Sequence, residues 1–539
     1  MITTNLLKNV TSKTPKLFMS TSAESIAFEK KLEHYRNLNA ADTADTKPPG
    51  WDEAKPFKSI PGPRSFPLVG NIWRLMLPLF RGQDILEVHK GLYKEFGDIF
   101  VLKGMAGSWI KEIVTLYNPK DFETLARNEG VWPIRKNQPS LDYYQKIRTN
   151  LFSGIALVGQ QREDWFKFRT IVNPIMMQPK NIAQYTDKMN LVADELVENI
   201  KYLATQNKDG EMPSDFKNEL YKWALESVAV VTLDTHLGCL KQGLKPDAEP
   251  EKMIYSATQF FDLMYKLDIL PSVWKLVSTK DWKKFVGVLD FMIQTNIKYI
   301  NRALDKLEKE EVDTENEIKS VLQQLLKKDR KVAISMAISM MVAGIDTTGR
   351  VLGAGLYFLA KNPDKQIKLR EEAISLLKTK ETPITKEVLA KAPYLRAVVK
   401  EVTRLAPIGI GNFRTTVKDI ILGGYQIPKG TDVLTSNLIL CSMDEHYPKA
   451  KEFLPERWLT TTSPELSHKS ANPFVFAPFG HGSRSCIGRR LANLELHVAF
   501  LKMIRNFDMR WEHEDMTFAT TTLYGIAKPL KLRVKPLDQ

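Results

Sequence analysis

Two stretches of the chain show the hydrophobic periodicity of long buried helices. Apolar residues recur at steps of three and four at Leu491, Leu494, Val498 and Leu501, which predicts a buried helix that begins at about Ile487. Residues from about 329 to 360 read as one helix that Asn362-Pro363 ends, and ~32 residues at ~1.5 Å each span ~48 Å. Its stretch 332–344 is apolar apart from two serines and is too short for a membrane span. We therefore expect a helix that crosses the core of a large domain.

The front half of the chain also reads mostly as helix. Apolar-periodic stretches alternate with polar breaks from Ile85 to Ile300, and few of them alternate as a strand would. The exceptions are two short strands that we predict around Ile99–Leu102 and Ile113–Leu116. A stiff, turn-rich segment precedes this part, with Pro56, Pro61, Gly62, Pro63, Pro67 and Gly70.

Composition and charge narrow the classes of function. Of the 539 residues, 43% are hydrophobic and 26% charged, as in folded soluble proteins. Cys239, Cys441 and Cys486 cannot form a disulfide framework, which favours a reducing compartment. The net charge is +14, and because residues 1–50 carry seven basic and five acidic groups, most of the surplus lies on the rest of the chain. Such a surplus attracts an acidic partner or an anionic membrane, whereas no zinc-ligand spacing or basic–aromatic repeat supports nucleic-acid binding.

The first fifty residues have the composition of a targeting segment. Residues 1–23 hold three lysines, eight Ser or Thr residues and no acid, which predicts a mitochondrial transit peptide. The use of Lys without Arg departs from the usual pattern, and a disordered tail without an address is the alternative. These residues contain no apolar run of 18 residues, so we do not expect an N-terminal membrane anchor. With the linker Pro48-Pro49-Gly50, residues 1–50 are interpreted as transit peptide and linker, and residues 51–539 as one domain.

The segment 479–488, Phe-Gly-His-Gly-Ser-Arg-Ser-Cys-Ile-Gly, is the strongest candidate for chemistry. Cys486 lies where the predicted helix begins, and free N–H groups and the helix dipole there stabilise a thiolate. The small residues let a large flat ligand approach the backbone, and Arg484 can meet an anion on that ligand. A haem iron bound through cysteine has these requirements. The alternative is an inert buried cysteine in a tight turn.

The pattern Phe479-x-x-Gly482-x-Arg484-x-Cys486-x-Gly488 resembles the haem-binding signature of the cytochrome P450 haem-thiolate monooxygenases. The resemblance extends from about residue 57 to the C-terminus. It implies the cytochrome P450 fold, mainly α with a small β-rich lobe. It also implies that haem b is the cofactor, with Cys486 as the axial ligand of its iron and Arg484 beside the porphyrin.

Three further residues resemble positions that bind the haem propionates in this family. Trp165 and Arg169 are four residues apart on a predicted helix and therefore share a face. The pair is similar to the family's W-x-x-x-R, although such a pair taken alone is usually surface packing. Arg414, seven residues after Pro407, matches another propionate-binding arginine of the family.

The long helix is interrupted by Ala343-Gly344-Ile345-Asp346-Thr347-Thr348. The small residues Ala343 and Gly344 open a groove beside the helix, and Thr347 can hydrogen-bond back to the carbonyl of Ala343. We expect Asp346 and Thr347 to face an otherwise apolar pocket. The string is similar to the family's A/G-G-x-D/E-T-T, which implies that both residues are catalytic and relay protons for oxygen activation, and that Gly344 adjoins the cofactor. In isolation it would be a helix kink.

A structural set and a partner face follow from the same resemblance. Glu401, Arg404 and Arg457 look like the family's E-x-x-R and P-E-R-F, which lock the core around the cysteine loop, with Trp458 in place of the usual Phe. Arg396 and Lys400 are four residues apart and are expected to project into solvent. They align with the pair by which mitochondrial members bind their [2Fe–2S] ferredoxin, and Arg489-Arg490 also resembles that clan. The alternative is ordinary solvated cations.

Together these patterns predict a mitochondrial haem-thiolate monooxygenase, most like insect members. It would use O₂ and two electrons from an acidic ferredoxin and its NADPH-dependent reductase to hydroxylate a lipophilic substrate, either a steroid-like hormone or a xenobiotic. In the family, the segments that correspond to 125–160 and 250–295 roof the substrate cavity and touch the bilayer, which implies peripheral contact with the matrix side of the inner membrane. A haem-thiolate isomerase or dehydratase without an electron donor, and a non-catalytic haem-binding sensor, are the alternatives.

Overall fold

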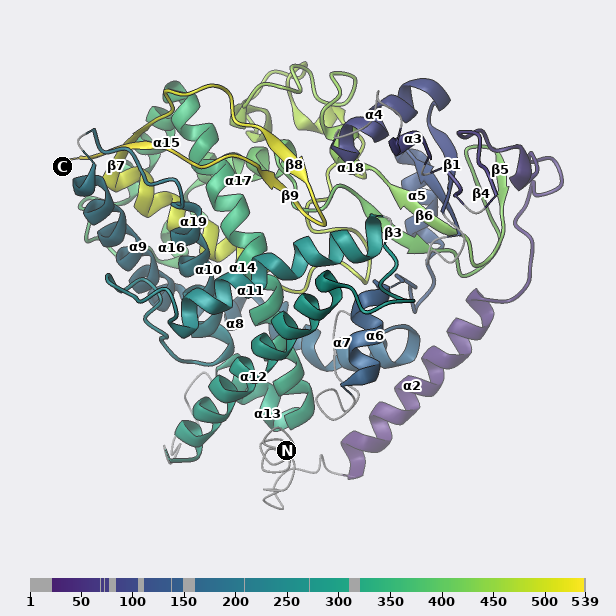
Figure 1. Cartoon of the computed structure of the whole chain (residues 1–539), viewed down its shortest axis with the longest axis horizontal. Coiled ribbons are helices and arrows are strands. Elements are labelled where there is room, and N and C mark those ends of the chain that lie inside the picture. The colour runs from purple at the N-terminus through teal and green to yellow at the C-terminus, as the bar shows by residue number, and fades with distance from the viewer. Residues whose placement is uncertain are drawn as a thin grey trace.

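The computed structural model describes residues 22–67, 69–71, 73–76, 84–104, 111–136, 138–148, 160–207, 209–270, 272–309 and 320–537. The segment that we predict to be a transit peptide, residues 1–23, lies outside this part of the chain except for its last two residues. The described chain is mainly helical, with a β-rich lobe at one end (Figure 1). This agrees with the predicted fold class.

Helices of very different lengths form the body. In the first half they are α2 (Ser22–Asp42), η1 (Phe57–Ser59), α3 (Trp73–Met76), α4 (Ile85–Phe96), α5 (Pro119–Arg127), α6 (Pro139–Ile147), α7 (Arg162–Met176), α8 (Pro179–Ala183), α9 (Thr186–Gln206), α10 (Lys217–Thr232), α11 (Glu249–Met264) and η2 (Tyr265–Ile269). In the second half they are α12 (Lys280–Lys309), α13 (Val321–Lys328), α14 (Arg330–Lys361), α15 (Pro363–Leu376), α16 (Lys386–Ala390), α17 (Pro393–Leu405), α18 (Asn437–Cys441), η3 (Pro455–Trp458), η4 (His468–Ser470) and α19 (Arg489–Asn506).

The β-rich lobe contains one four-stranded sheet and is joined by short two-stranded ribbons. The strands are β1 (Ile99–Lys103), β2 (Glu112–Leu116), β3 (Asn412–Thr415), β4 (Ile420–Leu422), β5 (Tyr425–Ile427), β6 (Asp432–Thr435), β7 (Phe507–Arg510), β8 (Phe518–Thr520), β9 (Tyr524–Ile526) and β10 (Arg533–Pro536). The sheet has the order β1-β2-β6-β3, in which β2 and β6 run parallel and the other neighbours antiparallel. The two strands predicted in the front half, β1 and β2, pair with each other from Ile99 opposite Leu116 to Lys103 opposite Glu112.

Helix α14 crosses the middle of the helical body, as its sequence predicts (Figure 1). The carboxylate of Asp329 accepts the N–H groups of Lys331 and Val332 at 2.7 and 3.0 Å and caps the helix start. Asn362 ends the helix before Pro363, which begins α15. Within the described chain α14 is the one helix long and apolar enough to cross a membrane, and 56% of its apolar stretch is buried in the protein. It is therefore a core helix.

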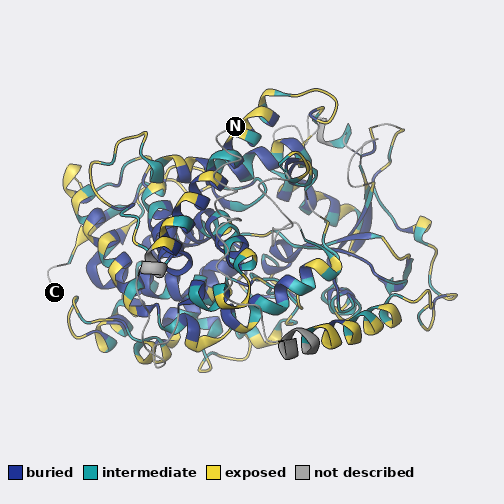
Figure 2. Cartoon of the chain, turned by 90° about the horizontal axis from the view of Figure 1, so that it is seen from below, coloured by how far each residue is buried: buried dark blue, intermediate teal, exposed yellow. Residues whose placement is uncertain are grey.

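The buried apolar residues form two clusters that match the two parts of the fold. The larger lies among the helices and includes Trp223, Met341, Leu352 and Phe500, and the smaller lies around the sheet and includes Phe100, Val114 and Val433. Figure 2 shows buried residues concentrated inside the body, with exposed residues along its edges. The long helix α14 packs on both α10 and α19 in the larger cluster. They position the residues that the sequence analysis selects.

Candidate active site

The cysteine loop runs from Phe479 to Gly488 and leads into α19. Gly480 and Gly482 have φ angles of +72° and +71°, which few other residues adopt without strain, and they turn the chain back on itself. The N–H of Cys486 then donates to the carbonyl of Phe479 at 2.8 Å and closes the loop. Because Gly488 is the N-cap, α19 begins at Arg489, two residues after the predicted start. Cys486 therefore precedes the helix terminus by three residues.

Burial and the neighbouring polar groups act in opposite directions on the charge of Cys486. Its side chain is exposed, although protein surrounds it closely enough for burial to raise the pKa of the thiol above its ordinary value. The N–H of Gly488 and the charges of Arg169 and Arg135 oppose this rise but do not outweigh it. The N–H of Gly488, the N-cap of α19, thus favours the thiolate, as the sequence predicts, while burial acts in the opposite direction. A metal ion bound to the sulfur would favour the thiolate further.

Four arginines gather beside the cysteine loop: Arg135, Arg169, Arg414 and Arg484. Burial and the charges of the other three lower the pKa of Arg484 to about 9, and burial is also the main reason that the pKa of Arg169 falls to about 10. In the described part of the chain only Arg414 ion-pairs with a carboxylate, through its Nε atom, 2.6 Å from Oε2 of Glu129. The Nε of Arg169 is buried and has no hydrogen-bond partner among the described residues. The cluster thus holds a surplus of buried positive charge, which suits an anionic ligand.

The structure brings four of the predicted haem-binding residues to the cysteine loop: Trp165, Arg169, Arg414 and Arg484. Arg169 donates to the carbonyl of Ser485 at 2.5 Å, and Arg414 donates to the carbonyl of His481 at 3.1 Å. The guanidinium of Arg484 lies 4.1 Å from the ring centroid of Trp165. The structure therefore brings the W-x-x-x-R pair and both other arginines to the cysteine loop.

Two residues of this cluster escaped the sequence analysis. Arg135 and Glu129 lie in the segment 129–135 between α5 and α6, which has no hydrophobic periodicity. Glu129 fills the space beside Gly482, where a Cβ atom would lie 2.1 Å from its Oε1. The neighbouring carbonyl of Pro133 accepts a hydrogen bond from Nε of Arg484 at 3.0 Å. Only the folded chain shows that this segment completes the cluster.

Thr347 takes the conformation that the sequence predicts. Its Oγ1 donates to the carbonyl of Ala343 at 2.7 Å, one turn back along α14. Ala343 is exposed and Thr347 half-buried, although most of the residues around them on this core helix are buried. This face of α14 therefore borders space that the protein does not fill, and Thr347 lies on that side.

Asp346 does not face that space, contrary to the expectation that it shares a pocket with Thr347. Its carboxylate is completely buried, and its Oδ2 accepts a hydrogen bond from Nε of Arg350 at 2.8 Å. The hydroxyl of Tyr221 on α10 also interacts with this carboxylate. Adjacent helix residues point about 100° apart, so the two side chains leave α14 in different directions. Burial raises the pKa of Asp346, and Arg350 opposes that rise.

Gly344 allows two helices to pack closely. A Cβ atom at this position would lie 2.4 Å from Cγ2 of Val228 on α10. The absence of a side chain therefore lets α10 approach α14 closely. The assignment of Gly344 to the cofactor stays a prediction, and its neighbour Ala343 lies on the open side of α14.

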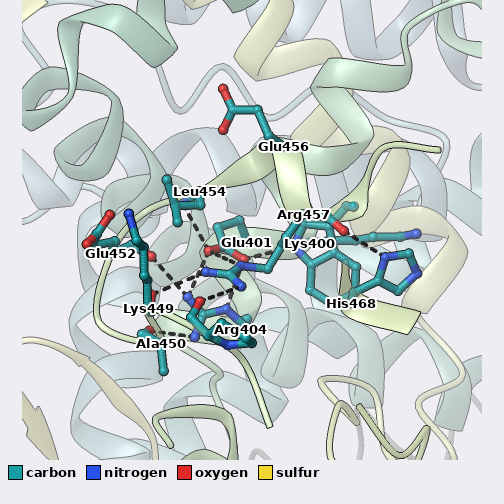
Figure 3. Close-up of polar contacts among 12 residues, drawn as sticks. Lys400, Glu401, Arg404, Lys449, Ala450, Glu452, Leu454, Glu456, Arg457 and His468 are labelled. Carbon is teal, nitrogen blue, oxygen red and sulfur yellow. Dashed lines mark hydrogen bonds and ion pairs between the residues drawn. The ribbon is translucent and has the colours of Figure 1, made fainter. Parts of the chain in front are cut away.

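The scaffold set is a buried ionic network (Figure 3). Arg404 donates two hydrogen bonds to Glu401, from Nη2 to Oε1 at 2.7 Å and from Nε to Oε2 at 2.9 Å. The Nε of Arg457 also donates to Oε1 of Glu401, at 3.0 Å. Arg404 also donates to the carbonyls of Cys441 and Ala450, both at 2.7 Å. The network ties α17 to the chain that precedes the cysteine loop. Because its charges are fully buried and mutually paired, the loss of either partner of a pair would leave an uncompensated charge.

Trp458, the departure from the family's Phe, joins this network. Its Nε1 donates to Oε2 of Glu401 at 2.8 Å. The indole thus supplies a hydrogen bond that a phenyl ring cannot make. Its outer face also lies against Lys400, whose Nζ is 5.5 Å from the ring centroid.

The four cations assigned to a partner face differ in how free they are. Lys400 and Arg489 are exposed, as expected. Arg396 is not free, because its Nη1 donates to the carbonyls of Leu389 and Ala390 at 2.7 and 3.1 Å, at the end of α16. The Nε of Arg490 similarly donates to the carbonyl of Met177 at 2.6 Å. The expectation that Arg396 and Lys400 both project freely holds only for Lys400.

The donor set of the site fits a haem. The thiol of Cys486 is accessible to a metal ion, and the neighbouring arginines carry unneutralised charge for the two carboxylates of a porphyrin. A helical fold with such a cysteine loop and arginine cluster defines the class of haem-thiolate proteins.

Comparison with known proteins agrees with this class. The family model described as Cytochrome P450 matches residues 60–534. The chain is 37% identical to Cytochrome P450 CYP12A2 of Musca domestica, with 93% of this chain and 95% of that protein covered. It is 38% identical to the Probable cytochrome P450 12a5, mitochondrial, of Drosophila melanogaster, with 90% and 92% covered. It is 35% identical to the Probable cytochrome P450 12c1, mitochondrial, of the same species, with 93% and 96% covered.

The chain belongs to the cytochrome P450 family. It is accordingly a monooxygenase that binds haem through a cysteine thiolate, and the structure presents Cys486 for that bond.

Proposed function

We propose that the protein is a mitochondrial monooxygenase that hydroxylates a lipophilic substrate with O₂ and two electrons from an acidic [2Fe–2S] ferredoxin and its NADPH-dependent reductase. The juxtaposition of Cys486 with the arginine cluster is the observation that carries the haem chemistry. The substrate class includes steroid-like hormones and xenobiotics. The bound haem supplies the iron at which O₂ is activated.

The haem would be held by residues of four segments. Cys486 would ligate the iron, and Arg135, Arg169, Arg414 and Arg484 would bind the two propionates. Burial and the neighbouring arginines lower the pKa of Arg484 to about 9, and burial lowers the pKa of Arg169 to about 10, so carboxylates of a ligand would stabilise both charges. Trp165 would keep Arg484 in place by packing against its guanidinium.

Thr347 and Asp346 would move the protons that oxygen activation consumes. The hydroxyl of Thr347, anchored on the carbonyl of Ala343, would hold a water molecule or pass a proton on the open side of α14. Asp346 would supply protons from the other side of the helix, where Arg350 and Tyr221 surround it. Because the two side chains leave the helix in different directions, Asp346 must change rotamer or act through water to reach Thr347.

Lys400 and Arg489 would contact the electron donor directly. Both are exposed cations near the segments that hold the cysteine loop, and an acidic ferredoxin would be attracted to them. Arg396 would act on the donor less directly, since the carbonyls at the end of α16 hold its guanidinium.

The relatives and an exposed apolar patch support a location at the inner mitochondrial membrane. Two of the relatives described above carry the word mitochondrial in their names. Between η2 and α12 the structure exposes Leu270, Val273, Leu276 and Val277, with Leu276 87% exposed. Lysines 275 and 280 flank these residues and are also exposed. This patch would rest on the anionic matrix side of the inner membrane, which places the protein as a peripheral membrane protein.

Reconstitution of the purified haem protein with a ferredoxin and its reductase tests this function. We expect NADPH-dependent reduction of the haem and an oxygenated product from some member of a panel of steroids and lipophilic xenobiotics. Rearrangement of a peroxide without NADPH would instead indicate an isomerase. A protein that binds haem but is never reduced by ferredoxin would contradict the proposal.

A further inference from the structure

Helix α2 precedes residues 60–534, which the family model matches, yet one of its faces packs on the body. The residues on this face follow one another at steps of four and three: Phe28, Leu32, Tyr35, Asn39 and Asp42. Leu32 is buried to 1% exposure, and the residues between these positions are exposed except Arg36. Figure 2 shows the opposite face of α2 in contact with solvent along the edge of the molecule. One face of α2 is therefore docked on the body and the other faces solvent.

The docked face contacts α7, the helix that carries Trp165 and Arg169. Arg36 forms two hydrogen bonds with Glu163, at 2.7 and 3.2 Å, and this pairing is the main reason that the pKa of Glu163 falls to about 2. The ring of Tyr35 packs on that of Phe166 with centroids 4.5 Å apart. Both contacts lie on the first turn of α7, next to Trp165.

The end of α2 contacts the segment 129–135, which completes the arginine cluster. The Oδ2 of Asp42 accepts the N–H of Val131 at 3.3 Å. Directly after the helix, Nζ of Lys429 donates hydrogen bonds to the carbonyl of Thr43 at 2.7 Å and to the carboxylate of Asp45 at 2.9 Å. One helix thus touches two of the segments that position the arginines beside Cys486.

We propose that α2 is a brace of the haem site that the mature protein keeps, so that removal of a targeting segment ends before Ser22. The sequence agrees, because α2 contains Glu24, Glu29 and Glu33, whereas transit peptides are poor in acids and residues 1–23 have none. The processing part of this proposal rests on the proposed mitochondrial location. The brace part does not.

Two truncations of the haem-loaded protein test the brace. A chain that lacks residues 2–21 should release haem to apomyoglobin at the rate of the full chain. A chain that lacks residues 2–46 should release haem about tenfold faster, since Leu32 and the contacts to α7 and Val131 are lost. Equal release rates for the two truncations would overturn the proposal.

Single substitutions separate the brace from a general failure to fold. Leu32→Ala and Tyr35→Ala each remove packing from the docked face and should raise the haem-release rate about threefold or more. Asn37→Ala changes an exposed residue of the same helix and should leave the rate unchanged. Leu32→Ala and Tyr35→Ala rates equal to that of Asn37→Ala would show that docking of α2 does not support the haem site.

Import of the full precursor into isolated mitochondria tests the processing. The mass of the imported protein should correspond to a chain that still begins at or before Ser22. A mature N-terminus after Ser22 would overturn the proposal. A precursor that is not imported would contradict the proposed location and the processing part, whereas the haem-release rates decide the brace independently.

Discussion

The buried carboxyl group of Glu495 should make the stability of this protein depend on pH. Glu495 lies on α19, nine residues after Cys486, and its side chain is 2% exposed. Its Oε1 has no hydrogen-bond partner among the described residues, and the hydroxyl of Thr348 on α14 is the group that stabilises its charge. Burial outweighs this hydrogen bond and raises the pKa of Glu495 to about 8.

The sign of the effect follows from this raised pKa. Below the pKa of the unfolded chain, near 4.5, both states hold the proton and Glu495 carries no penalty. As the pH rises towards 8, the unfolded state loses the proton first, so the free energy of unfolding falls. At ~1.4 kcal/mol per pKa unit, the loss is about 3 kcal/mol at pH 7 and about 4–5 kcal/mol above pH 8. Glu495→Gln removes the ionisation and should remove this loss.

Urea unfolding of the haem-loaded protein, followed by circular dichroism between pH 5 and 9, measures the effect. Glu495→Gln should match the parent protein near pH 5 and exceed its stability increasingly above pH 6. Glu465→Gln makes the same change on an exposed carboxylate and should leave the pH profile unaltered. A Glu495→Gln profile parallel to that of the parent protein would refute the reasoning.

Four further substitutions test individual residues of the site. Thr347→Ala should uncouple the reaction, because the hydroxyl on the open side of α14 is lost: NADPH consumption should persist while product falls and peroxide rises, and unchanged coupling would refute the relay. Lys400→Glu should slow the first reduction of the haem by ferredoxin about tenfold and weaken the salt dependence of that rate. Arg396→Glu should also slow this reduction, and it should lower the midpoint temperature of unfolding because the hydrogen bonds to the end of α16 are lost. Normal reduction of both variants would exclude the docking face. Trp458→Phe should lower the free energy of unfolding by about 1–2 kcal/mol through loss of the hydrogen bond to Glu401, and an unchanged value in urea unfolding would contradict that bond.

The parts of the fold that local sequence controls could be predicted. The bounds of α14 differ by one residue from those expected, because its cap at Asp329 and its end before Pro363 are local signals. The strands β1 and β2 were also predictable, whereas β6 is a short strand whose parallel pairing with β2 joins residues that are more than 300 positions apart. The docking of α2 depends on Glu163, 127 residues after Arg36, and no local pattern indicates it.

The site shows the same division between local and distant contacts. The hydrogen bond from Thr347 to Ala343 follows from helix spacing, and so does the pair of Glu401 and Arg404. The direction of Asp346 depends on α10 as well as on its own helix, and the sequence analysis placed it wrongly. Arg135 could not be found from the sequence because its segment has no periodicity, and its role depends on three other segments that meet it in the folded chain.

The bond between the sulfur of Cys486 and the haem iron is the central claim, and the absorption spectrum of the reduced protein with carbon monoxide tests it most directly. The account predicts the strongly red-shifted Soret band that thiolate ligation produces, and predicts its loss in Cys486→Ser. A reduced carbon monoxide complex without that band, or a Cys486→Ser variant that retains it, would contradict the account.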